Sequence, residues 1–147
     1  MLYAGDRANA KDEILEWLDL GYIVVCNRYI GSNIAHMGAK FKKTAERKKY
    51  SDWLLDVEYK GNGIPVEDLV ILLQVSPKIT KGLMEGRKLD IHEKDFAYQE
   101  EVFRLYKLIA KQKKNWEVVD CAFGEKVLPI SNVHDKVLAL LKRRKII

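Results

Sequence analysis

Residues 22–29 have the sequence YIVVCNRY, which contains the first of three short apolar runs that indicate the fold. Residues 69–75 (LVILLQV) and 116–121 (WEVVDC) contain the other two runs. The first two are rich in Val, Ile and Leu with little alternation, which is typical of parallel strands buried on both faces of a sheet. The third alternates more and indicates a strand nearer the edge of the sheet.

Helical patterns occupy the segments between these runs. From the spacing of apolar residues we expect helices at residues 6–20, 43–60, 76–85, 95–114 and 131–143. Ser76 and Pro77 form a good helix start, because Ser is a favoured N-cap and Pro is favoured at the first helical position. Strands that alternate with helices imply a parallel sheet with right-handed crossovers. We therefore predict an α/β fold in a single domain, residues 1–147.

The composition is that of an ordinary globular protein. Of the 147 residues, 48% are apolar and 32% are charged, which excludes a disordered chain. No apolar run approaches the ~20 residues that cross a bilayer, and the first residues lack the pattern of a signal peptide. Cys26 and Cys121 are isolated, which indicates buried thiols in a reducing compartment. We expect a cytoplasmic protein without a membrane partner and, because its three histidines are scattered, without a metal site.

The net charge of +5 favours anionic partners such as phosphorylated metabolites or nucleic acid. The basic residues concentrate at residues 40–49 and 142–145. Charge runs of this kind are more often solvated helix faces and a charged tail than binding sites. The sequence contains no known nucleic-acid-binding motif, and in particular no interleaving of aromatic and basic residues of the RRM kind. Nucleic acid is therefore not the expected partner.

Arg28 is the first candidate for ligand binding. In open parallel sheets, ligands bind at the carboxyl ends of the strands, and Arg28 follows the run that ends at Cys26. A guanidinium is always charged and its forked shape suits a phosphate. The alternative is an ordinary surface arginine in a loop.

Several motifs resemble those of the thymidylate kinases and follow that family's order along essentially the whole chain. Residues 24–38 (VVCNRYIGSNIAHMG) are similar to the family's strand, Asp-Arg-Tyr motif and Ser…Ala-Tyr-Gln-Gly segment. Residues 2–7 (LYAGDR) resemble its Leu-Phe-Ala-Ala-Asp-Arg signature. Residues 64–69 (IPVEDL) resemble its Pro-x-Pro-Asp-Leu approach to a strand, and residues 74–77 (QVSP) the Asp-Val-Pro-Pro that ends this strand. Each motif is weak alone, but their common order is not expected by chance.

The resemblance implies a three-layer P-loop-kinase-like fold, in which helices flank a parallel sheet and a lid lies at approximately residues 86–95. It implies transfer of the γ-phosphate of ATP to dTMP, which yields dTDP for dTTP biosynthesis, with Mg²⁺ as the metal ion. The P-loop motif Gly-x-x-x-x-Gly-Lys-Ser/Thr is absent from residues 1–147, whereas in the family it comes first. We therefore expect a chain without the N-terminal P-loop strand, which binds dTMP, needs the missing part for ATP and Mg²⁺, and transfers no phosphate alone.

The resemblance also assigns roles to individual residues. Tyr3 matches the aromatic residue that stacks on thymine, and Arg7 matches the arginine that contacts the base or the region of the acceptor phosphate. Arg28 matches the arginine that holds the dTMP phosphate, which positions the acceptor oxygen for attack and makes Arg28 a catalytic candidate. The other residues expected in the dTMP pocket are Tyr29, Ser32, His36, Met37 and Gln99. His36 replaces the family's Tyr or Phe, and Met37 replaces its Gln.

Arg87 and Asn27 are the other catalytic candidates. Arg87 and Lys88 match the cations of the lid, which neutralise the charge that develops on the transferred phosphate. Asn27 replaces the family's Asp, which lies beside Mg²⁺ and the acceptor phosphate. The amide keeps the shape of that residue but loses its charge, so the organisation of the metal should suffer.

A parallel sheet without its P-loop strand would expose unpaired backbone and apolar faces, which proteins avoid. We therefore expect the isolated chain to fold poorly, to pair with a complementing N-terminal fragment, or to repack, and a homodimer is a further candidate assembly. The alternative function is a degenerate, non-catalytic module of the same fold that binds nucleotides, nucleic acid or another protein. A steep salt dependence of DNA binding would favour this module, whereas a P-loop encoded upstream of Met1 would favour the kinase.

Overall fold

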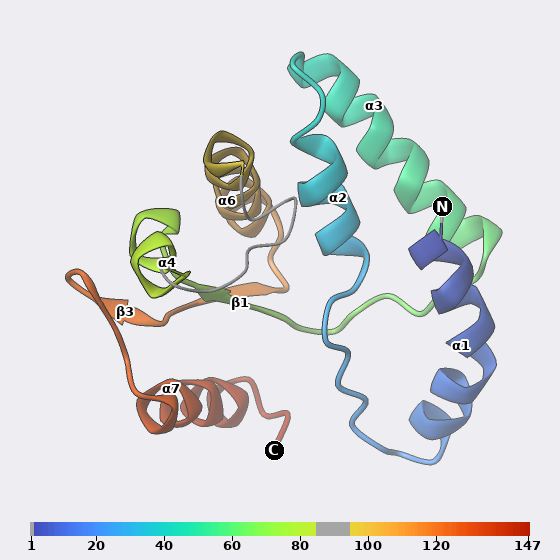
Figure 1. Cartoon of the computed structure of the whole chain (residues 1–147). Coiled ribbons are helices and arrows are strands. Elements are labelled where there is room, and N and C mark those ends of the chain that lie inside the picture. The colour runs from blue at the N-terminus through green and yellow to red at the C-terminus, as the bar shows by residue number, and fades with distance from the viewer. Residues whose placement is uncertain (1, 85–94) are drawn as a thin grey trace. The chain divides into compact units, whose positions relative to one another are not determined.

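The structure is a computed structural model that describes residues 2–84 and 95–147. Figure 1 shows the order of its elements along the chain. The chain divides into two compact units, Met1–Glu67 and Asp68–Ile147, and each has a hydrophobic core of its own. Within the described residues, no helix combines the length and the apolarity needed to cross a membrane.

The first unit is built from helices. They are α1 (Leu2–Asp19), α2 (Ile30–Gly38), α3 (Thr44–Leu55) and a π-helical turn, η1 (Asp56–Gly61), which continues α3 directly. Ile30, Leu54 and Ile64 form the buried core, so α2, α3 and the segment after η1 are held together by apolar contacts. Gly21 ends the α1 region with a φ of +80°, a conformation that glycine adopts without steric cost.

The strand predicted at residues 22–26 is wrong. These residues form no helix or strand, and Tyr22, Ile23 and Val25 are each more than half exposed. A strand needs a neighbour that pairs with its backbone groups. Among the described residues, no backbone–backbone hydrogen bond involves residues 23–28. The run therefore has the composition of a buried strand but remains unpaired, and Arg28 follows an exposed segment, not the rim of a sheet.

The second unit contains the strands. Its elements are β1 (Val70–Gln74), α4 (Pro77–Met84), α6 (Phe96–Gln112), β2 (Trp116–Asp120), β3 (Ala122–Phe123), β4 (Lys126–Val127) and α7 (Ile130–Arg143). β1 and β2 are parallel, with Val70 opposite Trp116 and Gln74 opposite Asp120. β3 and β4 form a separate antiparallel hairpin, whose turn contains Gly124 at a φ of +60°.

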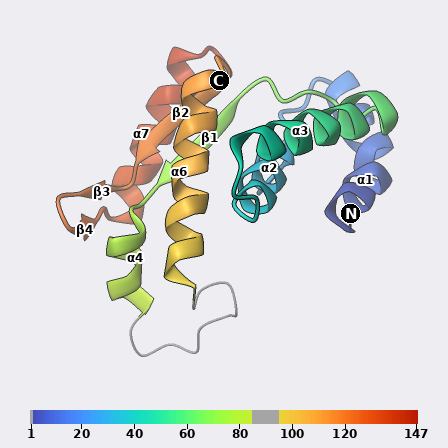
Figure 2. The ribbon, with the colours of Figure 1, turned by 90° about the horizontal axis from the view of Figure 1, so that it is seen from above.

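The second unit has three layers, because α6 and α7 lie on opposite faces of the β1–β2 pair (Figures 1 and 2). Val119 and Cys121 pack with Leu140 of α7 on one face. On the other face Trp116 meets Tyr106 of α6, with ring centroids 6.4 Å apart. This alternation along β2 explains why its sequence alternates.

The predicted strands at residues 69–75 and 116–121 are confirmed as β1 and β2, and their pairing is parallel. The predicted helices correspond to α1, α3 with η1, α4, α6 and α7. Helix α2 and the β3–β4 hairpin were not predicted. Since the described sheet contains two parallel strands and not three, the chain is a mixed α/β protein that is mostly helical.

Candidate functional site

A buried ion pair joins two distant parts of the first unit. Arg7, in α1, donates from Nε to Oε2 of Glu58 over 3.3 Å and from Nη2 to Oε1, and Glu58 lies in η1, 51 residues further along the chain. Glu58 is completely buried, and the side chain of Arg7 is only 13% exposed. A lone charge at this depth would be strongly destabilising, so each group compensates the burial of the other. The pair thereby sets the direction of the Arg7 guanidinium.

Tyr29 contacts the same guanidinium. The Cζ atom of Arg7 lies 5.9 Å from the centroid of the Tyr29 ring, which is a cation–π arrangement. The Tyr29 hydroxyl donates a hydrogen bond of 2.8 Å to the carbonyl oxygen of Pro65. Burial above all, and then the electrostatic influence of Cys26, Glu67 and Glu58, raises the pKa of Tyr29 from 10.0 to about 12, so the hydroxyl keeps its proton at neutral pH. We call Arg7, Tyr29 and Glu58 the Arg7 cluster.

The π-helical turn holds Glu58 beneath α1. After this turn the chain folds back on η1, because the Ile64 N–H donates to the carbonyl oxygen of Glu58 over 3.0 Å. Tyr59 donates from its hydroxyl to Oε2 of Glu67 over 2.6 Å, and burial together with this bond raises the pKa of Tyr59. π-Helical turns are frequent at functional sites, and here the turn carries the carboxylate that meets Arg7.

Tyr3 and Arg7 are four residues apart in α1, which places them on the same face of the helix. The Tyr3 side chain is 69% exposed, whereas Arg7 is largely buried by its partners. An exposed aromatic ring one turn from a fixed guanidinium is an arrangement that a planar ligand could cover.

Arg28 has a left-handed backbone conformation, with a φ of +68°. This conformation is rare for residues other than glycine and costs of order 1–3 kcal/mol. The Arg28 side chain is exposed, and the residue directly precedes Tyr29 of the Arg7 cluster. Strained backbone of this kind concentrates at ligand-binding sites, so Arg28 is a stronger candidate in the structure than its position in the sequence alone suggests.

The remaining predicted pocket residues of the first unit lie on α2. Tyr29 is the N-cap residue of this helix, but its side chain makes no capping hydrogen bond. Ser32 and His36 are half-buried and four residues apart, and Met37 is exposed. Helix α2 therefore begins directly after Arg28, which is the predicted phosphate-binding residue, and Tyr29, which is a predicted residue of the dTMP pocket.

Other predicted residues lie elsewhere. Asn27 is exposed and belongs to the unpaired segment before α2. Gln99 belongs to α6 of the second unit. Arg87 and Lys88, and nearly all of the predicted lid, lie outside the described residues.

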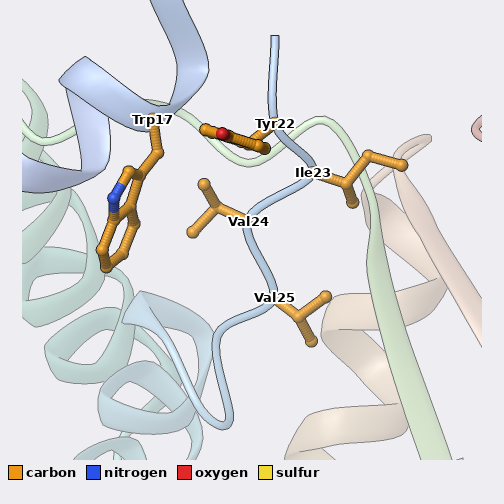
Figure 3. A pocket seen from close by; sticks show the side chains of 5 residues that line it. All are labelled: Trp17, Tyr22, Ile23, Val24 and Val25. Carbon is orange, nitrogen blue, oxygen red and sulfur yellow. The ribbon is translucent and has the colours of Figure 1, made fainter. Parts of the chain in front are cut away.

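A hollow of about 500 Å³ lies at the other end of α1. It is lined by Trp17, Tyr22, Ile23, Val24 and Val25. In Figure 3 the Trp17 and Val24 side chains face each other, while Ile23 and Val25 point to the opposite side of the segment. None of the predicted site residues lines this hollow, so it is not part of the candidate site.

The chain is similar to known proteins of one family. The family described as "Thymidylate kinase" matches residues 1–137. The chain belongs to the thymidylate kinase family. It is 32% identical over 119 residues to "Thymidylate kinase" of Mycobacterium tuberculosis (strain ATCC 25618 / H37Rv), an alignment that covers 76% of this chain and 55% of that protein. It is 28% identical over 144 residues to "Probable thymidylate kinase" of Pyrococcus abyssi (strain GE5 / Orsay), covering 97% of this chain and 63% of that protein.

A third thymidylate kinase, from Finegoldia magna, is 28% identical over 152 residues and is covered to 68% of its length. The chain thus spans between about half and two thirds of the length of the curated thymidylate kinases that it matches. Within residues 2–84 and 95–147, no three His, Cys, Asp or Glu side chains gather closely enough to hold a metal ion.

No pattern in the sequence indicates Glu58 as a site residue. It lies inside the segment that was predicted as one continuous helix at residues 43–60, where an isolated Glu is normally a solvated charge. Its partner is 51 residues away, so no spacing in the sequence indicates the ion pair.

Proposed function

We propose that this chain carries the dTMP-binding part of a thymidylate kinase, and that the complete activity is transfer of the γ-phosphate of ATP to dTMP. The observation that carries the proposal is the Arg7 cluster, since it joins the α1 motif of residues 2–7 to the Arg28-Tyr29 motif before α2. These two motifs are the ones that the resemblance assigns to dTMP. The single-domain organisation of a kinase remains part of the proposal.

The phosphate of dTMP is assigned to Arg28 and the start of α2. The exposed guanidinium of Arg28 always carries charge and can bind a phosphate through two parallel hydrogen bonds. The N-terminus of a helix adds backbone N–H groups and the positive end of the helix dipole. This N-terminus has no capping side chain, and its Ser32 N–H donates to the carbonyl oxygen of Tyr29 over 3.0 Å, so the N–H groups before Ser32 are the ones proposed to bind the anion. In this role Arg28 positions the acceptor oxygen for in-line attack.

The base of dTMP is assigned to Tyr3 and Arg7. An exposed aromatic ring can stack on a base, a contact worth about 1–3 kcal/mol. The charge of Arg7 is balanced by Glu58, so Arg7 suits a neutral carbonyl better than a phosphate. Ser32, His36 and Met37 of α2 are proposed to complete the pocket.

The transfer step needs groups that the described structure does not contain. ATP supplies the phosphate, and Mg²⁺ together with the lid cations Arg87 and Lys88 is proposed to neutralise the charge that develops on it. Asn27 is proposed to lie beside the acceptor phosphate as a neutral hydrogen-bonding group. Because no P-loop motif occurs in residues 1–147, we propose that this chain binds dTMP but transfers no phosphate by itself.

Calorimetry with dTMP, dUMP, dCMP and dAMP tests the proposal. We expect dTMP to bind most tightly, and we expect Arg28→Ala to weaken its binding about tenfold or more, since a charge-assisted contact is worth about 1.5–3 kcal/mol. Lys40→Ala, which removes an exposed cation near the end of α2, is the matched control and should change nothing. Equal binding of all four nucleotides, or an Arg28→Ala variant with unchanged affinity, would contradict the proposal.

One observation favours a second function. Asn27 stands where the family has an acidic residue, which a binding module could lack at no cost. Such a module would bind nucleotides or nucleic acid without catalysis. Titration of the chain with single-stranded and duplex DNA at several salt concentrations distinguishes the two, because binding through phosphates weakens steeply with salt.

A further inference from the structure

We propose that Glu58 is the positioning residue of this site: it holds the Arg7 guanidinium in one orientation against Tyr29, so that the unused N–H groups of Arg7 face a neutral acceptor on the ligand. The inference rests on the proposed function for the identity of the ligand. It assigns a role to a residue that no sequence motif of the site contains.

The donors of Arg7 define this orientation. A guanidinium has five N–H donors in a rigid plane. Glu58 receives one from Nε, over 3.3 Å, and one from Nη2. In the described structure Arg7 makes no other hydrogen bond, so the two N–H groups of Nη1 and the second of Nη2 remain for a ligand. Because the plane is rigid, fixing two donors also fixes the direction of the other three.

The contacts of Glu58 fit a positioning role better than a contact with the ligand. Its side chain has no exposed surface, so the carboxylate cannot reach a bound nucleotide. The residue is fixed from two sides, since its backbone carbonyl also accepts the N–H of Ile64 over 3.0 Å. The Tyr29 ring restricts the movement of the guanidinium on another side, because the Cζ atom of Arg7 lies 5.9 Å from the centroid of that ring. Glu58 therefore acts through Arg7 and Tyr29.

The charge of Glu58 also selects the acceptor. An arginine that is already paired with a buried carboxylate has little net charge to offer a phosphate, whereas its directional N–H groups still bind a carbonyl oxygen. Arg28 has no such partner among the described residues and stays exposed. The two arginines are thus divided between the two ends of one nucleotide.

The test compares two ligands, dTMP and deoxyribose 5-phosphate, which lacks the base. We expect Glu58→Gln to weaken dTMP binding about tenfold and to leave deoxyribose 5-phosphate binding unchanged, and we expect Glu58→Asp to recover part of the loss. A merely structural role would weaken both ligands equally. Asp56→Asn, which removes an exposed carboxylate of the same turn that pairs with Lys60, is the control and should affect neither ligand.

Two further measurements keep the inference open to refutation. If Glu58→Gln does not fold, the double variant Arg7→Met with Glu58→Met replaces the buried pair by apolar side chains of similar volume, a change that proteins often tolerate. Its preference for dTMP over deoxyribose 5-phosphate should be about tenfold smaller than that of the unaltered chain, since only the stacking on Tyr3 remains. A double variant that prefers dTMP as strongly as the unaltered chain does would overturn the inference.

The exchange of the Arg7 Nε–H with water, followed by NMR, needs no ligand. We expect this proton to exchange at least about tenfold faster in Glu58→Gln than in the unaltered chain. Unchanged exchange would refute the positioning role. If the chain binds neither dTMP nor deoxyribose 5-phosphate, the proposed function fails. The positioning role of Glu58 still stands in that case if the Arg7 Nε–H exchanges slowly with water in the unaltered chain and rapidly in Glu58→Gln.

Discussion

The guanidinium carbon of Arg7 lies 5.9 Å from the centre of the Tyr29 ring, so an arginine near the start of the chain rests against the residue that precedes α2. Glu58 closes this arrangement from η1. Three segments that are far apart in the sequence thereby meet at one buried polar point, next to the exposed Arg28. This is the arrangement on which the assignment of a dTMP site depends.

Removal of the buried carboxylate should destabilise the first unit severely. In Glu58→Ala the Arg7 guanidinium loses its partner, and breaking a buried ion pair in this way costs about 3–5 kcal/mol. Urea unfolding followed by circular dichroism measures the loss. The Arg7→Met, Glu58→Met double variant should have nearly the same free energy of unfolding as the unaltered chain. If Glu58→Ala lowers the free energy of unfolding by less than about 1 kcal/mol, the carboxylate is not buried against Arg7.

The stability of the chain should fall in alkali partly because of Tyr29. Its pKa is raised from 10.0 to about 12 in the folded chain, so above pH 10 the unfolded chain loses this proton first. The stabilisation is complete below pH 10 and disappears as the pH rises through about 12. Tyr59, whose pKa is also raised, acts in the same direction.

Tyr29→Phe isolates this contribution. The variant loses the bond to the Pro65 carbonyl and should be about 0.5–1.5 kcal/mol less stable at pH 7. Its urea midpoint should fall less between pH 10 and pH 12 than that of the unaltered chain. An identical pH dependence in both proteins would show that Tyr29 is not the group responsible.

Arg28→Gly should separate stability from binding. Arg28 has a φ of +68°, a conformation that glycine adopts without strain, so the substitution relieves strain. Glycine also loses more conformational entropy on folding, which opposes this gain in stability. The balance predicts a variant that is as stable as the unaltered chain or up to about 1 kcal/mol more stable, but that has lost most of its affinity for dTMP. Urea unfolding and calorimetry of the same sample measure both quantities. An Arg28→Gly variant that is less stable than the unaltered chain but still binds dTMP would contradict this prediction.

The unpaired segment before α2 should tolerate polar substitution. Val25 is 88% exposed, so Val25→Asp should change the free energy of unfolding by less than about 0.5 kcal/mol. Leu54→Ala, in the buried core of the same unit, should cost about 2–5 kcal/mol and serves as the comparison. A loss above about 1.5 kcal/mol for Val25→Asp would mean that this segment is buried as a strand after all.

Apart from the β3–β4 hairpin, the elements of the second unit could be predicted from the sequence because their signals are local. The apolar runs that became β1 and β2 are short and bounded, and the Ser76-Pro77 pair marks the start of α4. The run at residues 22–26 carries the same signal and fails, because a strand also depends on a partner that composition does not report. Helix α2 was missed for a related reason: its nine residues include two glycines and no long apolar stripe.

The candidate site could be predicted only in part. The motifs led to Arg7, Arg28 and Tyr29, which α1 and the segment before α2 bring close together. The motifs did not indicate that Arg7 is buried and paired, since Glu58 is 51 residues distant and resembles an ordinary surface acid. A π-helical turn at residues 56–61 has no recognised sequence signal either, and it is this turn that carries Glu58.

The most direct test of the dTMP site is a map of backbone amide chemical shifts as dTMP is added to the chain. We expect the largest changes at Tyr3, Arg7 and residues 28–32, and we expect Arg28→Ala to abolish those at residues 28–32. No change on addition of dTMP, or changes confined to other parts of the chain, would contradict it.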